Sequence, residues 1–162
     1  MPGFFAKLFG RNEKKEADFA LPREVYNPTN EADRVAVALL AILGKQLDLL
    51  GFSMGSVPID QTFGSDQCRG ALLGTAIGIV QSEVESPSNK AILDATTTAF
   101  ALVYGDEIGP RYALETIRDS SAGNDVINAS SEWAIGDTKG VYSSGGVTSA
   151  VGFYVAAKQM IE

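Results

Sequence analysis

The sequence predicts a single all-α domain of five or six helices, preceded by a flexible N-terminal arm. Long segments carry apolar residues at helical spacing, and glycine or proline stands at their boundaries. No long segment shows the apolar–polar alternation of a half-buried strand. The second choice is an α+β fold with a small hairpin near residues 136–145. The basic amphipathic arm and its linker occupy residues 1–28, and the helical domain occupies residues 29–162.

The composition predicts one soluble globular domain. The chain has 162 residues, of which 45% are hydrophobic and 20% are charged, and this length can bury a substantial core. The net charge of −7 disfavours nucleic acid as a partner, because binding phosphates requires a basic surface. No segment has the roughly 20 apolar residues of a membrane span, and the N-terminus lacks a secretory signal pattern. We therefore expect a cytoplasmic protein.

The chain contains no histidine and a single cysteine, Cys68. Zinc, haem and iron–sulfur sites would lack their usual ligands, and only an all-oxygen site for magnesium or calcium remains open. Because the carboxylates form no recognisable metal-binding pattern, we predict no metal and no cofactor. One cysteine cannot form an intramolecular disulfide, which is compatible with a reducing cytoplasm. We expect Cys68 to be a small buried residue rather than a reactive thiol.

The missing histidine also decides how residues 51–55 are interpreted. Their sequence, Gly-Phe-Ser-Met-Gly, fits the G-x-S-x-G pattern of a nucleophile elbow. A serine in such an elbow needs a neighbouring histidine to take its proton. We therefore predict that Ser53 is not a nucleophile and lies in a turn just after a helix.

Residues 1–15 form a basic segment on an otherwise acidic chain. Four basic side chains against one acidic side chain give +3, whereas nine basic and nineteen acidic side chains give −10 in the remainder. We predict that residues 2–15 are an interaction element outside the main fold, binding an anionic membrane surface or an apolar groove on a partner. The alternatives are packing on the domain's own surface and a disordered tail. The apolar residues at helical spacing are Phe4, Phe5, Leu8 and Phe9.

The first helix of the domain is predicted over residues 31–50. Thr29 or Asn30 supplies the N-cap, and Gly51 ends the helix because glycine accepts a left-handed conformation without steric cost. Residues 35–43 are apolar on nearly every side of this helix. That pattern indicates a central helix or one covered by a partner.

The second helix is predicted from Ser65 and Asp66 to about Glu85. Gly70, Gly74 and Gly78 recur along it every four residues. Glycine within a helix costs about 1 kcal/mol relative to alanine, so three in register indicate a compensating close approach of another helix. We predict a crossing within the chain, with self-association of two copies as the alternative.

Proline and glycine mark the later helices. The third is predicted from Ser86-Pro87 to Gly105 and the fourth from Pro110 to about residue 120. The fifth begins at Asn124 or Asp125, carries the only tryptophan, Trp133, and ends at Gly136. The final helix is predicted from about residue 147 to residue 161.

Residues 136–146 are predicted to form a glycine-rich loop ahead of the final helix. Free N–H groups at a helix N-terminus attract anions, and glycine lets a phosphate approach the backbone. This loop is therefore the best candidate for binding a small molecule, with a plain helix cap as the alternative. The candidate ligand-binding residues are Lys139, Ser143, Ser144, Gly145 and Gly146.

Two classes of function remain. The favoured one is a non-enzymatic helical interaction or assembly protein that self-associates or docks on a protein partner, peripheral to a membrane through its arm. The other is a small-molecule or anion-binding domain, or an enzyme, that uses residues 136–146. It loses support because histidine, the commonest acid–base residue, is absent. The candidate interaction residues are Phe4, Phe5, Leu8, Phe9, Gly70, Gly74 and Gly78, and no catalytic residue is predicted.

Overall fold

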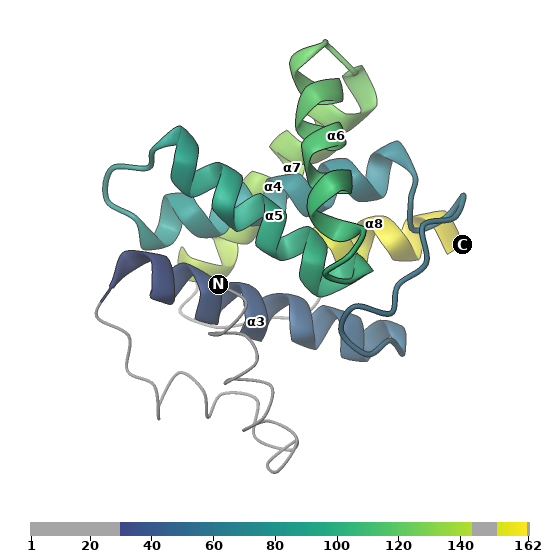
Figure 1. Cartoon of the computed structure of the whole chain (residues 1–162), viewed down its shortest axis with the longest axis horizontal. Coiled ribbons are helices and arrows are strands. Elements are labelled where there is room, and N and C mark those ends of the chain that lie inside the picture. The colour runs from purple at the N-terminus through teal and green to yellow at the C-terminus, as the bar shows by residue number, and fades with distance from the viewer. Residues whose placement is uncertain (1–29, 144–151, 162) are drawn as a thin grey trace.

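The computed structural model describes residues 30–143 and 152–161, and within these ranges it contains helices and no strands. The all-α prediction is therefore confirmed, whereas the predicted arm lies outside the described residues. Figure 1 shows how the six helices are arranged. They are α3 (Glu31–Leu50), α4 (Asp66–Glu83), α5 (Asn89–Tyr104), α6 (Gly109–Ser121), α7 (Asp125–Ser143) and α8 (Gly152–Ile161).

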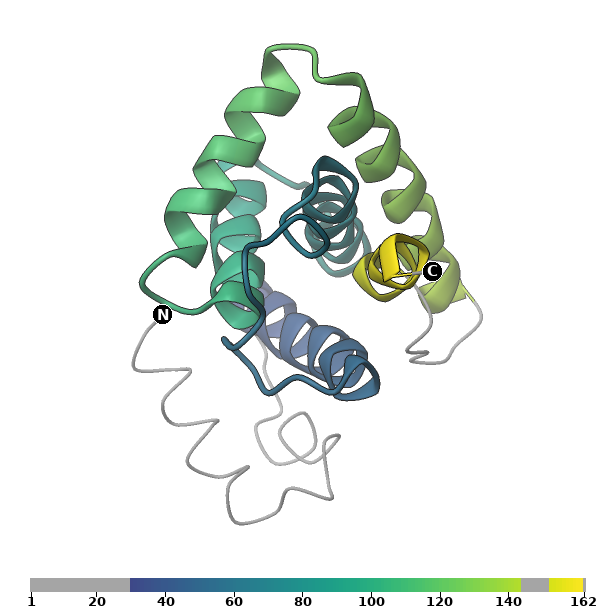
Figure 2. The same cartoon turned by 90° about the vertical axis from the view of Figure 1, so that its right-hand side faces the viewer.

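Helix α4 is the centre of the molecule. It contacts each of the other five described helices, and its most extensive interface is with α7. Figure 2, viewed nearly along α4, shows α6 and α7 on either side of it and α3 below. The core therefore surrounds α4 and the facing sides of α3, α5 and α8. Its largest fully buried side chains include Leu39, Leu43, Leu72, Ile79, Phe100 and Phe153.

Helix α3 begins and ends where its sequence predicts. The Asn30 side chain accepts hydrogen bonds from the N–H groups of Ala32 and Asp33, at 2.7 and 3.3 Å. Gly51 follows the last turn with a φ of 82°, in the left-handed region. Most of residues 35–44 are buried against other helices of the same chain. The apolar surface of α3 is thus explained by the fold itself.

The glycines of α4 let α7 approach its backbone. A Cβ atom on Gly70 would lie 2.5 Å from the Ile127 carbonyl oxygen, and one on Gly78 would lie 2.9 Å from Thr138 Cβ. A Cβ on Gly74 would overlap the Ser131 carbonyl. The prediction of a close crossing within the chain is therefore confirmed for Gly74. Close packing along α7 offsets the low helix propensity of the three glycines.

Helix α7 is longer than its sequence predicts. The expected end at Gly136 and the expected loop over residues 136–143 are wrong, because α7 continues to Ser143. Thr138 and Val141 are buried in these last turns, and this packing outweighs the low helix propensity of Gly136 and Gly140. The second-choice hairpin is also excluded over residues 136–143. The predicted ligand residues Ser144, Gly145 and Gly146 lie outside the described residues.

Smaller differences occur at other helix ends. Helix α5 begins at Asn89 rather than at Pro87, because Ser88 is its N-cap and accepts a hydrogen bond from Ala91 N–H at 3.1 Å. Helix α7 is capped as predicted by Asn124, whose side-chain oxygen accepts from Ile127 N–H at 3.0 Å. Helix α8 begins at Gly152 within the described residues, and the predicted start near residue 147 lies outside them.

Candidate functional site

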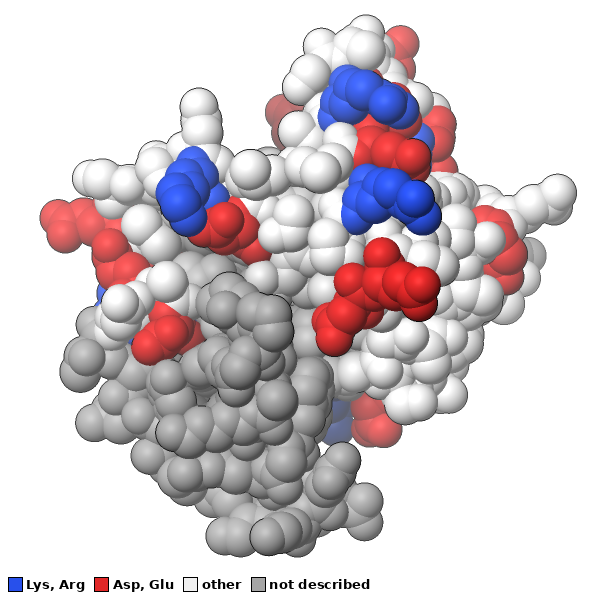
Figure 3. Space-filling model, viewed as in Figure 1, with Lys and Arg blue, Asp and Glu red and all other residues white. Residues whose placement is uncertain are grey.

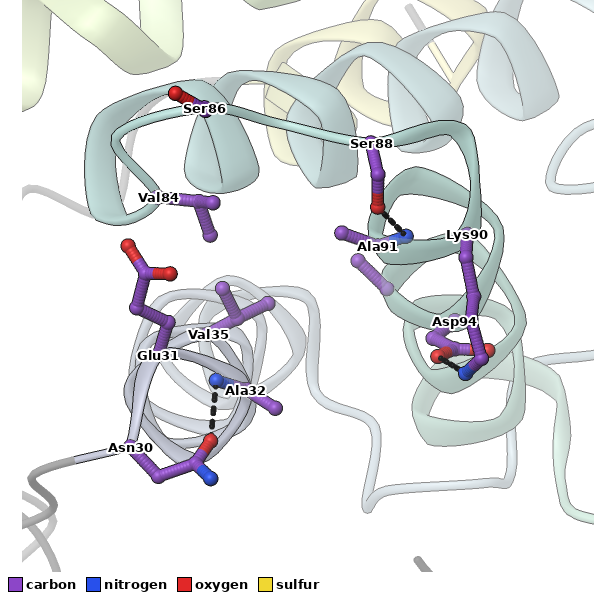
Figure 4. Close-up of a pocket in the computed structure, with 11 residues that line it drawn as sticks. Asn30, Glu31, Ala32, Val35, Val84, Ser86, Ser88, Lys90, Ala91 and Asp94 are labelled. Carbon is purple, nitrogen blue, oxygen red and sulfur yellow. Dashed lines mark hydrogen bonds and ion pairs between the residues drawn. The ribbon is translucent and has the colours of Figure 1, made fainter.

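A groove of about 440 Å³ opens between the first turns of α3 and α5, beside the loop that joins α4 to α5 (Figure 4). The first turn of α3 is about 50 residues away in sequence from the loop and α5, so the groove forms only in the fold. Asn30, the first described residue, lies at the rim of this groove. Its lining residues are Asn30, Glu31, Ala32, Val35, Val84, Ser86, Ser88, Lys90, Ala91, Asp94 and Ala95.

Most polar groups at the rim of this groove already have partners in the fold. Asn30 and Ser88 cap the two helices, and Lys90 Nζ lies 2.6 Å from Asp94 Oδ2. A carboxylate oxygen of Glu31 accepts a hydrogen bond from Glu85 N–H at 3.0 Å. These local bonds leave small apolar side chains as the remaining lining. The groove is therefore suited to receive an apolar side chain, and it places no nucleophile beside a base.

A buried charged group lies elsewhere, where α4 and α6 meet the start of α7. The Arg69 side chain is only 10% exposed, and its guanidinium lies 2.9 Å from both Asp66 Oδ1 and Asp119 Oδ2. It also lies over the Tyr112 ring, 5.5 Å from the ring centre. Asn124 donates a hydrogen bond of 3.1 Å to the other oxygen of Asp66. Both carboxylates are therefore engaged with one cation.

The hydrogen bond from Asn124 and the neighbouring Arg69 guanidinium hold the pKa of Asp66 below its ordinary range. A carboxylate that stays ionised and paired is a poor general acid or base at neutral pH. The cluster joins residues separated by about 50 positions in the chain. We interpret it as a structural connection between helices rather than as a reacting centre.

Two tyrosines fix the loop between α3 and α4. Tyr104 Oη donates a hydrogen bond of 2.5 Å to the Phe63 carbonyl, and Tyr112 Oη donates one of 2.7 Å to the Gly64 carbonyl. Burial raises the pKa of Tyr104 well above its ordinary value. The Tyr104 hydroxyl therefore stays protonated and serves as an anchor.

The nucleophile candidates from the sequence have structural roles. Cys68 is fully buried, and burial raises the pKa of its thiol. Its prediction as a small buried residue is confirmed. Ser53 lies in the turn after α3, as predicted, and its carbonyl accepts a hydrogen bond from the Ser56 hydroxyl at 2.6 Å.

Of the predicted ligand-binding residues, the structure describes Lys139 and Ser143, and neither lines the groove. Lys139 and Ser143 are exposed on α7, and the Ser143 hydroxyl donates to the Lys139 carbonyl at 3.2 Å. At the start of α8, Gly152 N–H donates to Asp137 Oδ2 at 3.2 Å. A carboxylate thus lies where an anion would bind this helix. Asp137 has no sequence signal for this role, because it is separated from Gly152 by 15 residues.

Charge is mixed over the described surface. Residues 30–143 and 152–161 contain eight basic and fifteen acidic side chains, a balance of −7. Figure 3 shows basic side chains standing next to acidic ones along α6, whose basic residues are arginines. Among the described residues, no group of three or more histidine, cysteine, aspartate or glutamate side chains is placed to hold a metal ion. None of the described helices has both the length and the apolar character needed to cross a membrane.

Comparison with protein-family models, curated proteins and solved structures finds no match for this chain.

Proposed function

We propose that this is a non-enzymatic helical interaction protein whose segment 2–15 binds an anionic membrane surface. The observation that carries the proposal is the difference in charge between the first 15 residues, which also contain three phenylalanines, and the described body. Residues 1–15 have a side-chain balance of +3 and contain three phenylalanines, whereas the described body has a balance of −7. Paired carboxylates and an apolar groove in the body also favour binding over catalysis.

The expected attachment is reversible. Each phenylalanine side chain that leaves water contributes about 1.5–3 kcal/mol, and each basic residue near an anionic surface adds about 1 kcal/mol. Ordering a short segment opposes these gains, and the acidic body is repelled by the same surface. We therefore expect binding that weakens as salt screens the charges.

Vesicle flotation tests the proposal with the full chain. Vesicles of phosphatidylcholine with phosphatidylserine should carry the protein upward at low salt, and vesicles of phosphatidylcholine alone should carry much less. A variant with Phe4→Ser, Phe5→Ser and Phe9→Ser should lose binding. A matched control with Ile108→Ser and Leu114→Ser, which removes exposed apolar residues from the body, should keep it.

The proposal fails if the protein does not float with anionic vesicles, or if the triple variant binds as well as the unchanged chain. A stable fold in the triple variant, checked by circular dichroism, excludes unfolding as the cause of lost binding. Anion binding at residues 136–146 has weaker support, because α7 includes the first eight of these residues and Asp137 already bonds to the first N–H of α8.

A further inference from the structure

The outer face of α7 carries an apolar stripe that the fold leaves uncovered. Val126 is 50% exposed and Trp133 is 43% exposed. Together with Ala129, Gly136 and Gly140, they follow one side of the helix in alternating steps of three and four residues. This is the spacing of residues at a helix–helix interface. We call these positions the α7 stripe. Its members are Val126, Ala129, Trp133, Gly136 and Gly140, all of them exposed.

Within residues 30–143 and 152–161, no packing contact explains the two glycines of the α7 stripe. A Cβ atom added to Gly136 or Gly140 would meet nothing within 4 Å. The glycines of α4 differ, because a Cβ on any of them would collide with α7. Glycine weakens a helix wherever it stands in the interior. The bare backbone on the outer side of α7 is therefore available for a close approach from outside.

The α7 stripe is complementary in size to an antiparallel copy of itself. Trp133 lies three residues before Gly136, and Gly140 lies four residues after it. If two α7 helices run antiparallel with a two-fold axis at Gly136, each Trp133 meets the bare backbone at Gly140 of the other copy. The two Gly136 residues meet at the axis, where no side chain keeps the helices apart.

Charges beside the stripe fit the same arrangement. Glu132 and Lys139 are exposed beside the stripe. Glu132 lies four residues before Gly136, and Lys139 lies three residues after it. Neither forms an ion pair with another side chain of residues 30–143 and 152–161. In the antiparallel pair, Glu132 of each copy comes opposite Lys139 of the other. In a parallel pair, Glu132 would instead lie near Glu132 of the other copy and Lys139 near Lys139, and these like charges would repel.

We propose that two copies of this chain associate through antiparallel α7 helices, with Trp133 of each copy packed on Gly140 of the other. Because only one helix of each copy takes part, we expect a weak dimer that forms as the protein concentration rises. It goes beyond the proposed membrane attachment and does not depend on it, because α7 and residues 2–15 are separate parts of the chain.

Sedimentation velocity and tryptophan fluorescence test this on the full chain over a range of concentrations. Trp133 is the only tryptophan, so its emission should shift to shorter wavelength as the dimer forms. Gly136→Glu should raise the dimer dissociation constant at least tenfold by placing two like charges at the axis. This substitution also replaces an exposed helix glycine with a better helix former, so the variant remains folded. Leu114→Glu, an exposed change on α6, is the matched control and should leave dimerisation unchanged.

Charge reversal tests the antiparallel register. Glu132→Lys and Lys139→Glu should each weaken the dimer several-fold, and the double variant should restore it. A protein that stays monomeric at every concentration, or whose dimer persists in Gly136→Glu, would overturn the proposal. Failure of the double variant to restore a dimer weakened by both single changes would overturn it as well. Vesicle binding is measured separately, so either proposal can fail while the other stands.

Discussion

Gly74 of α4 lies directly against the Ser131 carbonyl of α7, so close that a Cβ atom on Gly74 would overlap that group. Neighbouring contacts repeat this approach one turn earlier and one turn later, at Gly70 and Gly78. The two helices thus meet backbone to backbone, and a side chain at Gly74 can fit only if α7 moves away.

Gly74→Leu should therefore be strongly destabilising. Overpacking a close contact costs about 1–3 kcal/mol, and we expect this variant to reach at least the upper end of that range. Urea denaturation followed by circular dichroism measures the free energy of unfolding. Gly136→Ala, measured at a concentration at which the chain is monomeric, is the matched control, because the space beside Gly136 within the chain is open. It should be neutral or stabilising by up to about 1 kcal/mol. Equal stability of Gly74→Leu and the unchanged chain would contradict the close approach.

The cluster of Arg69, Asp66 and Asp119 should lose different amounts of stability when its cation is removed and when its two carboxylates are removed. The guanidinium is nearly buried, whereas Asp66 and Asp119 are 45% and 32% exposed at their side chains. Removing both carboxylates in an Asp66→Asn, Asp119→Asn variant leaves a buried charge unpaired, which costs about 3–5 kcal/mol. Arg69→Met leaves two carboxylates that water can still reach, so it should cost less. The opposite order in urea denaturation would show that Arg69 is not the critical member.

Acid should weaken the fold partly through Asp66. Its pKa is lower in the folded protein than in the unfolded chain, chiefly because of the Asn124 hydrogen bond and then Arg69. This contribution to stability is complete above about pH 4, the usual range of an aspartate pKa. It is lost as the pH falls through the lower, folded-state pKa. The free energy of unfolding should therefore fall less between pH 7 and pH 3 in Asp66→Asn than in the unchanged chain. Asp125→Asn, an exposed change at the start of α7, should show the ordinary fall, and an identical fall in both variants would refute this role.

The Cys68 thiol should be inert in the folded protein. It is fully buried, and burial raises its pKa, so the reactive thiolate is scarce. Labelling with a thiol-reactive disulfide reagent should proceed only as fast as the protein opens, and at full speed in denaturant. Ser53→Cys provides the comparison, since this exposed turn position should add one rapidly labelled thiol. Rapid labelling of Cys68 in the native chain would show that its site is open.

Local sequence signals predicted the helices and several of their ends. Asn30, Gly51 and Asn124 act within a few residues of themselves, so their capping roles can be inferred from the sequence alone. The end of α7 was not predictable in this way, because it depends on burying Thr138 against α4. The groove and the Arg69–Asp119 pair join residues tens of positions apart. No local sequence pattern predicts such contacts.

The central position of α4 has a consequence for the protein as it is being made. Residues 66–83 are synthesised before α7, the helix that covers their glycine face. At about 5–20 residues per second, that face stays uncovered for several seconds. During this interval it presents mostly bare backbone at Gly70, Gly74 and Gly78 rather than large apolar side chains. The nascent chain therefore offers chaperones and other nascent chains little to bind along this side of α4 while it waits for its partner helix.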